Sequence, residues 1–189
     1  MNNIEHDLSD VLNRLNFIFK NEEITTLCIK DYNGISIFNE KLKPFEKNKK
    51  YRLKFFIARI FIENNILIVA PNDKCDNIDV QRYAISERDN QKLMQRDISH
   101  FLNKIREFRF FMEKDVKDGV KPMIDLDKFN SYLSNIIDNR LLKLLRLSKA
   151  KLTLDDEKRL TISELKLYRL IFDLLNTWKK FFLNQYIIK

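Results

Sequence analysis

The stretch from Asp125 to Phe182 constrains the fold most strongly, because its apolar residues recur with the period of an α-helix in two successive segments. The stripe of the first segment consists of Phe129, Tyr132, Leu133, Ile136, Ile137, Leu141, Leu144 and Leu145. The stripe of the second consists of Leu165, Tyr168, Ile171, Phe172, Leu175, Trp178 and Phe182. Thr161 and Glu164 have the spacing of a capping box at the start of the second segment. We therefore predict two amphipathic helices joined by a short charged turn.

The second of these helices carries apolar residues on more than one side. Four of them lie off its main stripe: Leu167, Leu170, Leu174 and Phe181. A helix of this kind must be covered on more than one side, either by the rest of its own chain or by a partner subunit. The residues that we predict to lie at a subunit interface are Leu141, Leu145, Leu170, Leu174, Trp178, Phe181 and Phe182.

A small module precedes this pair, after an amphipathic helix predicted over residues 5–20. Its β-branched and apolar runs predict strands over residues 24–30, 35–38, 51–53 and 66–69 and a buried helix over residues 54–64. Asn33-Gly34 separates the first two runs, which predicts a hairpin because both residues tolerate positive φ. Asn65 is expected to end the buried helix in the left-handed conformation.

The polar, aperiodic residues 72–79 have the character of a linker, and everything beyond them has helical periodicity. We predict one long helix over residues 86–113, a break at Gly119 and Pro122, and a helix capped by Asp125 or Asp127. The predicted fold is α+β and mainly α: a strand–helix–strand module followed by a helical bundle. The predicted parts are residues 1–22, 23–71 and 80–189.

Motifs that carry catalysis or bind cofactors are missing from the sequence. Two glycines in 189 residues cannot form a phosphate-binding loop, and two histidines and two cysteines lie far from one another. The triplet Asp155-Asp156-Glu157 is better explained by the dipole of a helix start than by acid–base chemistry. We assign no catalytic, cofactor-binding or metal-binding residue. The sequence also lacks a secretory signal and a membrane-spanning run, so a cytoplasmic protein is expected.

The net charge of +8 permits contact with an acidic partner or with nucleic acid, although a lysine-rich surface can also be simply solvated. Arg140, Lys143 and Arg146 follow one another at three-residue steps, and no acidic residue lies between Asn139 and Leu154. Such a row can bind phosphates or an acidic protein surface. It can equally be a solvated helix end, where cations are favourable.

Several segments resemble the GINS replication proteins. Lys43-Pro44-Phe45 and the run from Tyr51 to Asn65 are similar to the small B-domain of that family. The run from Asn139 to Ser148 and the run from Thr161 to Tyr168 resemble its helical A-domain, and Trp178 matches a tryptophan near the end of the last helix. The small module comes first, which is the order of one of the two archaeal GINS subunit types.

The resemblance implies a non-catalytic scaffold. A sister GINS subunit would join this chain in a 2:2 hetero-tetramer through the helical domains. The tetramer would bind the MCM replicative helicase and a RecJ-like or Cdc-type partner at the replication fork, with weak or indirect contact to DNA. The alternatives are a stand-alone basic helical DNA-binding protein, an enzyme, for which no residue constellation is found, and an unrelated helical regulator.

Overall fold

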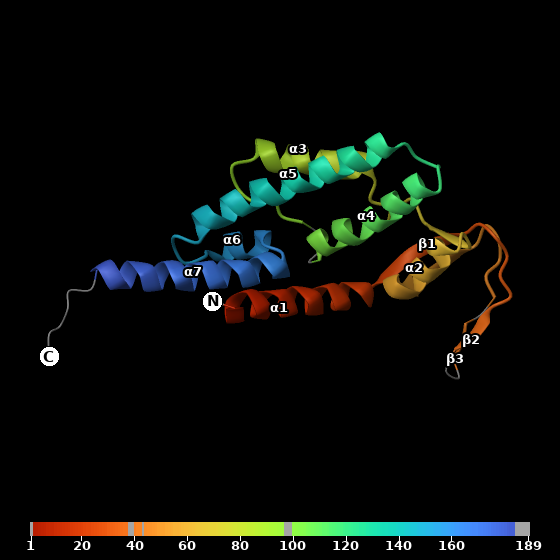
Figure 1. Cartoon of the computed structure of the whole chain (residues 1–189), viewed down its shortest axis with the longest axis horizontal. Helices are drawn as coiled ribbons and strands as arrows, with labels where there is room; N and C mark the ends of the chain where they lie inside the picture. Colours follow the sequence, from red (N-terminus) through yellow and green to blue (C-terminus); the bar gives the residue numbers. More distant parts are fainter. Residues whose placement is uncertain (1, 38–39, 43, 97–99, 184–189) are drawn as a thin grey trace. The chain divides into compact units, whose positions relative to one another are not determined.

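The structure is a computed structural model that describes residues 2–37, 40–42, 44–96 and 100–183. It has a mainly helical α+β fold, as the sequence predicts. Contacts divide the chain into two compact units (Figure 1): a small unit, Asn16–Cys75, and a helical unit that contains the remainder. Helix α1 (Asn2–Lys20) crosses this division, because its residues up to Leu15 belong to the helical unit.

The small unit contains a three-stranded antiparallel sheet with β1 (Glu23–Cys28) at its centre. Strand β4 (Lys50–Lys54) pairs with one side of β1, and β5 (Leu67–Val69) pairs with the other. Helix α2 (Phe55–Glu63) contacts all three strands. Its buried residues are Phe55, Ala58, Phe61 and Ile62. The core therefore lies between α2 and one face of the sheet.

The predicted hairpin around Asn33-Gly34 is wrong. Strand β1 pairs with β4 and β5, whereas β2 (Ile35–Ile37) pairs with β3 (Glu40–Leu42) in a separate two-stranded sheet. Tyr32 instead bridges to Phe45 through two backbone hydrogen bonds of 2.9 and 2.8 Å. The ring of Phe45 meets that of Phe61 of α2 with centroids 4.9 Å apart. Long-range pairing and aromatic packing thus override the local turn signal.

Helix α2 ends as the sequence predicts. Asn65 has φ +56°, and the backbone N–H groups of Asn65 and Ile66 donate to the carbonyls of Ile62 and Phe61 at 3.1 and 2.9 Å. This is the Schellman arrangement, which requires a residue that accepts the left-handed conformation.

Asn65 supports a direct test of this helix end. We expect Asn65→Gly to keep the stability of the chain, because glycine adopts positive φ without steric cost. Asn65→Val should lower the free energy of unfolding by about 1–2 kcal/mol, because its branched side chain clashes in that conformation. Urea unfolding of both variants measures the difference, and equal stability of the two would contradict the assignment.

The helical unit is built around α5 (Met123–Leu147), which packs against α3 (Asn77–Asp89), α4 (Phe101–Lys117) and α7 (Ile162–Leu183) (Figure 1). The short helix α6 (Leu154–Arg159) precedes α7. The core of the unit contains Val80, Ala84, Phe101, Ile105, Phe108, Met112, Leu126, Phe129, Ile136 and Leu144.

Three predicted helix limits in this unit are wrong. Helix α3 begins inside the predicted linker, at Asn77, where Asp76 forms a capping box with Asp79. The predicted helix 86–113 is interrupted, because α3 ends at Asp89 and α4 begins at Phe101. Helix α5 begins after Pro122, so Asp125 lies in its first turn and neither predicted aspartate is its cap. Proline suits this helix start because it has no N–H to satisfy.

Candidate functional site

The first half of α7 is fixed in place by polar contacts. The N–H of Thr161 donates to the Glu164 carboxylate at 2.8 Å, and the N–H of Glu164 donates to the Thr161 hydroxyl at 3.4 Å, which confirms the predicted capping box. One turn later, the Tyr168 hydroxyl donates to the carbonyl of Ala150 at 2.6 Å. The start of α7 is therefore held against the end of α5.

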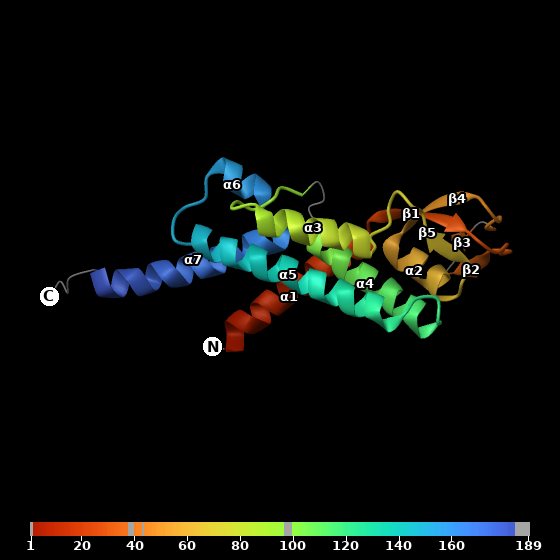
Figure 2. The same ribbon diagram turned by 90° about the horizontal axis from the view of Figure 1, so that it is seen from above.

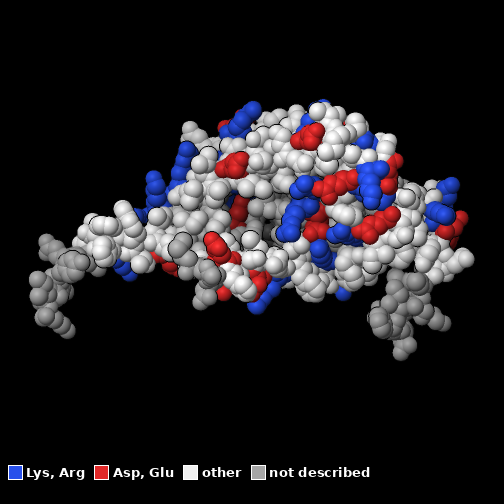
Figure 3. Space-filling view, in the orientation of Figure 1, with Lys and Arg blue, Asp and Glu red and all other residues white. Residues whose placement is uncertain are grey.

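The second half of α7 continues beyond the C-terminal end of α5 (Figures 1 and 2). Trp178, Phe181 and Phe182 are 64%, 68% and 64% exposed there. Their rings contact one another, with centroids 4.9 Å apart for Trp178–Phe182 and 5.0 Å apart for Phe181–Phe182. Figure 3 shows this end of the helix covered mainly by uncharged atoms. Three neighbouring aromatic side chains are thus presented to water.

Exposed apolar side chains also lie on α5. Leu141 and Leu145 are exposed there, one turn apart, beside exposed Ile137. A hollow of about 180 Å³ lies between α5, α7 and α4. Its lining consists of Leu102, Ile137, Arg140, Leu141, Leu144, Glu164 and Leu167. We give the name α5–α7 surface to seven of the exposed apolar residues of these helices: Ile137, Leu141, Leu145, Leu174, Trp178, Phe181 and Phe182.

Six of the seven residues predicted at a subunit interface belong to this surface, and the seventh, Leu170, is half-buried on the same helix. Leu141 lines the hollow, whereas Trp178, Phe181 and Phe182 lie near the end of α7. Whether a subunit binds there stays a prediction. Exposed apolar side chains grouped as those of Trp178, Phe181 and Phe182 are typical of protein interaction sites.

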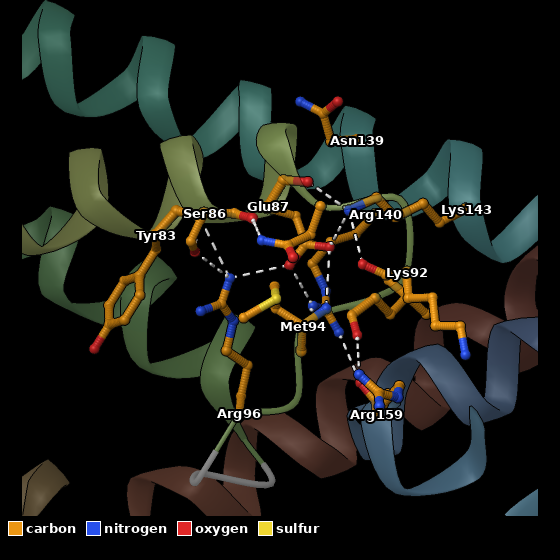
Figure 4. Close-up of polar contacts among 12 residues, drawn as sticks. Tyr83, Ser86, Glu87, Lys92, Met94, Arg96, Asn139, Arg140, Lys143 and Arg159 are labelled. Atoms are coloured by element: carbon orange, nitrogen blue, oxygen red, sulfur yellow. Dashed lines mark hydrogen bonds and ion pairs between the residues drawn. The ribbon is translucent and has the colours of Figure 1, made fainter. Parts of the chain in front are cut away.

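Two members of the predicted basic row, Arg140 and Lys143, are buried. Arg140 is only 2% exposed, and its guanidinium forms two hydrogen bonds to Glu164, of 2.5 and 2.7 Å, and one to Glu87, of 2.8 Å. It also donates to the carbonyls of Met94, at 3.0 Å, and Arg159, at 3.1 Å. Figure 4 shows Arg140 at the centre of these contacts. All of its donors therefore face protein acceptors.

Lys143 is buried in the same cluster. Its ammonium group donates to the Glu87 carboxylate at 2.7 Å, to the Glu87 backbone carbonyl and to the carbonyl of Lys92 at 3.2 Å. Arg96 reaches the other oxygen of Glu87 at 3.0 Å. Glu87, which is 0% exposed, thus receives three cations. We call Glu87, Arg96, Arg140, Lys143 and Glu164 the buried ion cluster.

The interpretation of Arg140, Lys143 and Arg146 as one exposed row is corrected by this cluster. Arg140 and Lys143 project from α5 into the unit, where carboxylates neutralise them, so they are not available to phosphates or to an acidic partner. Arg146 is exposed. The row fails because two of its members lie on the same side of α5 as buried Ile136 and Leu144.

In the buried ion cluster the pKa values of Glu87 and Arg140 shift toward the charged forms, whereas burial lowers the pKa of Arg96. Burial by itself would raise the pKa of Glu87, but the hydrogen bonds and charges of Lys143 and Arg140 outweigh it and hold that pKa below its usual value. Burial likewise acts to lower the pKa of Arg140, and Glu164 and Glu87 outweigh it, so that pKa is raised. Both partners are therefore charged at neutral pH.

The cluster also holds the connection between α3 and α4. Met94 and Lys92 supply carbonyls to Arg140 and Lys143, and Arg159 donates to the carbonyl of Leu93 at 3.3 Å. This explains why the predicted long helix is interrupted: residues 90–96 run across the buried side chains of α5 instead of continuing the helix. Glu87 and Arg96 are not recognisable from the sequence as partners, since they lie 53 and 44 positions before Arg140.

The residues considered for catalysis or metal binding do not lie together in the part of the chain that the structure describes. Among the described residues, His, Cys, Asp and Glu form no group of three that could hold a metal ion. Asp155, Asp156 and Glu157 occupy the first turn of α6, where Arg159 bonds Asp155 at 3.1 Å, as expected for a helix start. Within those same residues, no helix combines the length and apolarity needed to cross a membrane.

Comparison with known proteins places the chain in no family. Neither the scan against protein-family models nor the search among curated proteins gives a match.

Proposed function

We propose that this chain is a non-catalytic scaffold subunit that binds a partner subunit through the α5–α7 surface. The observation that carries the proposal is the exposed aromatic half of α7, with Trp178, Phe181 and Phe182 together beyond the end of α5. Aromatic residues are enriched at the centres of protein interfaces, whereas a solvated helix rarely groups them. The fixed start of α7 orients this surface before binding, which limits the entropy lost in assembly.

The identity of the partner rests on the resemblance to GINS proteins. Residues 139–148 and 161–168 resemble the helical domain through which those subunits assemble, and they lie on the two helices of the α5–α7 surface. The proposed partner is a sister GINS subunit in a 2:2 hetero-tetramer. The assembly would act in the cytoplasm at the replication fork, where it joins the MCM helicase to a RecJ-like or Cdc-type protein.

The alternative of a stand-alone DNA-binding protein loses its main support. Two of the three cations on which it rested are buried against carboxylates. On the face shown in Figure 3, Lys and Arg side chains are interspersed with Asp and Glu over the helical unit. A DNA-binding surface instead gathers cations along one face.

Expression of the chain with and without the sister subunit tests the proposal. Alone, the chain should self-associate as its concentration rises, because the α5–α7 surface is uncovered. Together, the two chains should sediment as one complex of defined mass, since an obligate interface of this kind buries about 2,000 Å² or more. Sedimentation velocity over a hundredfold concentration range measures both.

Two outcomes would contradict the proposal. One is a chain that stays monomeric at every concentration and does not bind the sister subunit. The other is a complex that forms but dissociates at moderate salt, because an apolar interface is insensitive to screening whereas an interface of exposed charges is not.

A further inference from the structure

The three-stranded sheet of the small unit has one covered face and one open face. Strand β1 alternates along its length, with Ile24, Thr26 and Cys28 buried on the side of α2. Glu23, Thr25 and Leu27 point to the opposite side, because successive side chains of a strand alternate between faces. The open face can be mapped from the pairing of β1 with its two neighbours.

One half of the open face is aliphatic. Leu27 lies opposite Ile68 in the pairing with β5, and the next pair along is Ile29 with Ile66, whose backbones are joined by a hydrogen bond of 3.0 Å. Ile29 and Ile68 are exposed, at 38% and 42%. Four aliphatic side chains therefore form a strip over β1 and β5.

The other half of the open face is basic. Lys50, Arg52 and Lys54 alternate with the inward-facing residues of β4, and all three are exposed. They lie opposite Leu27, Thr25 and Glu23 in the register with β1. Glu23 is paired with Arg52 at 3.2 Å, and among the described residues neither Lys50 nor Lys54 forms an ion pair. The face therefore combines an aliphatic strip with two unpaired ammonium groups at its edge.

We propose that this open sheet face docks a protein surface that carries carboxylates beside aliphatic side chains. Removal of the aliphatic strip from water stabilises the complex with such a surface. Lys50 and Lys54 select an acidic flank and disfavour a basic one. The open face of a second copy is a poor occupant, because it would place Lys50 and Lys54 against the same cations instead of carboxylates.

Nucleic acid fits this face less well than an acidic protein surface. Platforms for single strands stack bases on aromatic side chains, whereas the strip consists of leucine and isoleucine. The aromatic residues next to the sheet, Phe45, Phe61 and Tyr51, pack on the side of α2. The proposal does not depend on the identity of the subunit that binds the α5–α7 surface.

Three fluorescent probes test the proposal on the full chain at low ionic strength. The first is a short peptide of alternating leucine and glutamate, the second has lysine in place of glutamate, and the third is an oligo-dT strand. We expect the acidic peptide to bind and the basic peptide not to bind. Lys50→Glu with Lys54→Glu should weaken binding of the acidic peptide at least tenfold, as measured by fluorescence anisotropy.

A matched control reverses the charges of two exposed lysines of the helical unit, by Lys128→Glu with Lys166→Glu. This variant should keep the affinity for the acidic peptide unchanged. Ile68→Ser should weaken binding without changing charge. If the reversed pair does not fold, Lys50→Gln with Lys54→Gln removes the same charges and should also lower the affinity. The proposal is overturned if the acidic peptide does not bind, if both charge-reversed pairs lose affinity equally, or if oligo-dT binds more tightly and only the Lys50 and Lys54 variant loses it.

Discussion

Glu87→Gln should lower the free energy of unfolding by about 3–5 kcal/mol, because it leaves buried cations without their counter-charge. Glu87 forms ion pairs with Arg96 at 3.0 Å, Arg140 at 2.8 Å and Lys143 at 2.7 Å. Its side chain is fully buried. Glutamine keeps the size of the side chain and replaces one acceptor oxygen with a donor NH₂ group that faces other donors. Urea unfolding followed by circular dichroism measures the loss.

Glu113→Gln is the matched control. Glu113 also pairs with an arginine, Arg109 at 3.1 Å, but both side chains are close to half exposed. We expect this change to cost less than about 1 kcal/mol, because water screens an exposed ion pair. A loss of the same size in both variants would mean that the buried ion cluster contributes no more than a surface pair.

The pH dependence of stability should distinguish the original chain from the Glu87→Gln variant. A carboxyl group whose folded pKa is depressed stabilises the fold above its unfolded pKa, about 4.3 for glutamate, and that contribution is lost as the pH falls through the folded value. The pKa of Glu87 is lowered in the fold. The original chain should therefore lose stability below about pH 4.3 more steeply than the Glu87→Gln variant, which no longer has this group to protonate.

The cluster also shows which part of the site was predictable from the sequence. Arg140 is four positions after Ile136 and four before Leu144, so it lies on the apolar side of its helix, and Lys143 lies close to the same side. Cations at such positions indicate buried partners, and this signal was present in the sequence. The identity of the partner was not, because Glu87 is 53 positions away and pairs with Arg140 only through the packing of α3 on α5.

The same distinction holds for the fold. Helix α7, its capping box and the left-handed Asn65 depend on residues within a few positions of one another, and all three were predicted correctly. The prediction of a hairpin at Asn33-Gly34 is wrong because β1 pairs with β4 and β5, which come later in the chain. The long helix over residues 86–113 failed because side chains of α5 bind the backbone of residues 92–94. Local patterns specify elements, whereas distant partners decide where they end.

The α5–α7 surface leads to the last prediction, which concerns assembly. Trp178→Ala with Phe182→Ala should weaken binding of the sister subunit at least a hundredfold, or about 3 kcal/mol, because aromatic anchors supply most of the free energy of an interface. The free chain should keep its stability within about 1 kcal/mol, since exposed side chains away from caps and ion pairs contribute little to folding. Both rings are about two-thirds exposed, and their ring contacts are with one another and with Phe181 of the same helix.

The control for this variant removes apolar side chains that are at least as exposed but lie outside the α5–α7 surface, at Val120 and Leu154. Val120→Ala with Leu154→Ala should bind the sister subunit as the original chain does. Co-purification and sedimentation velocity at two salt concentrations measure binding, and urea unfolding of each free chain measures stability. A variant at Trp178 and Phe182 that unfolds would mean that these rings support the fold of the chain itself. A variant that folds and binds normally would place the interface elsewhere, because loss of two central aromatic side chains cannot leave an interface built on them intact.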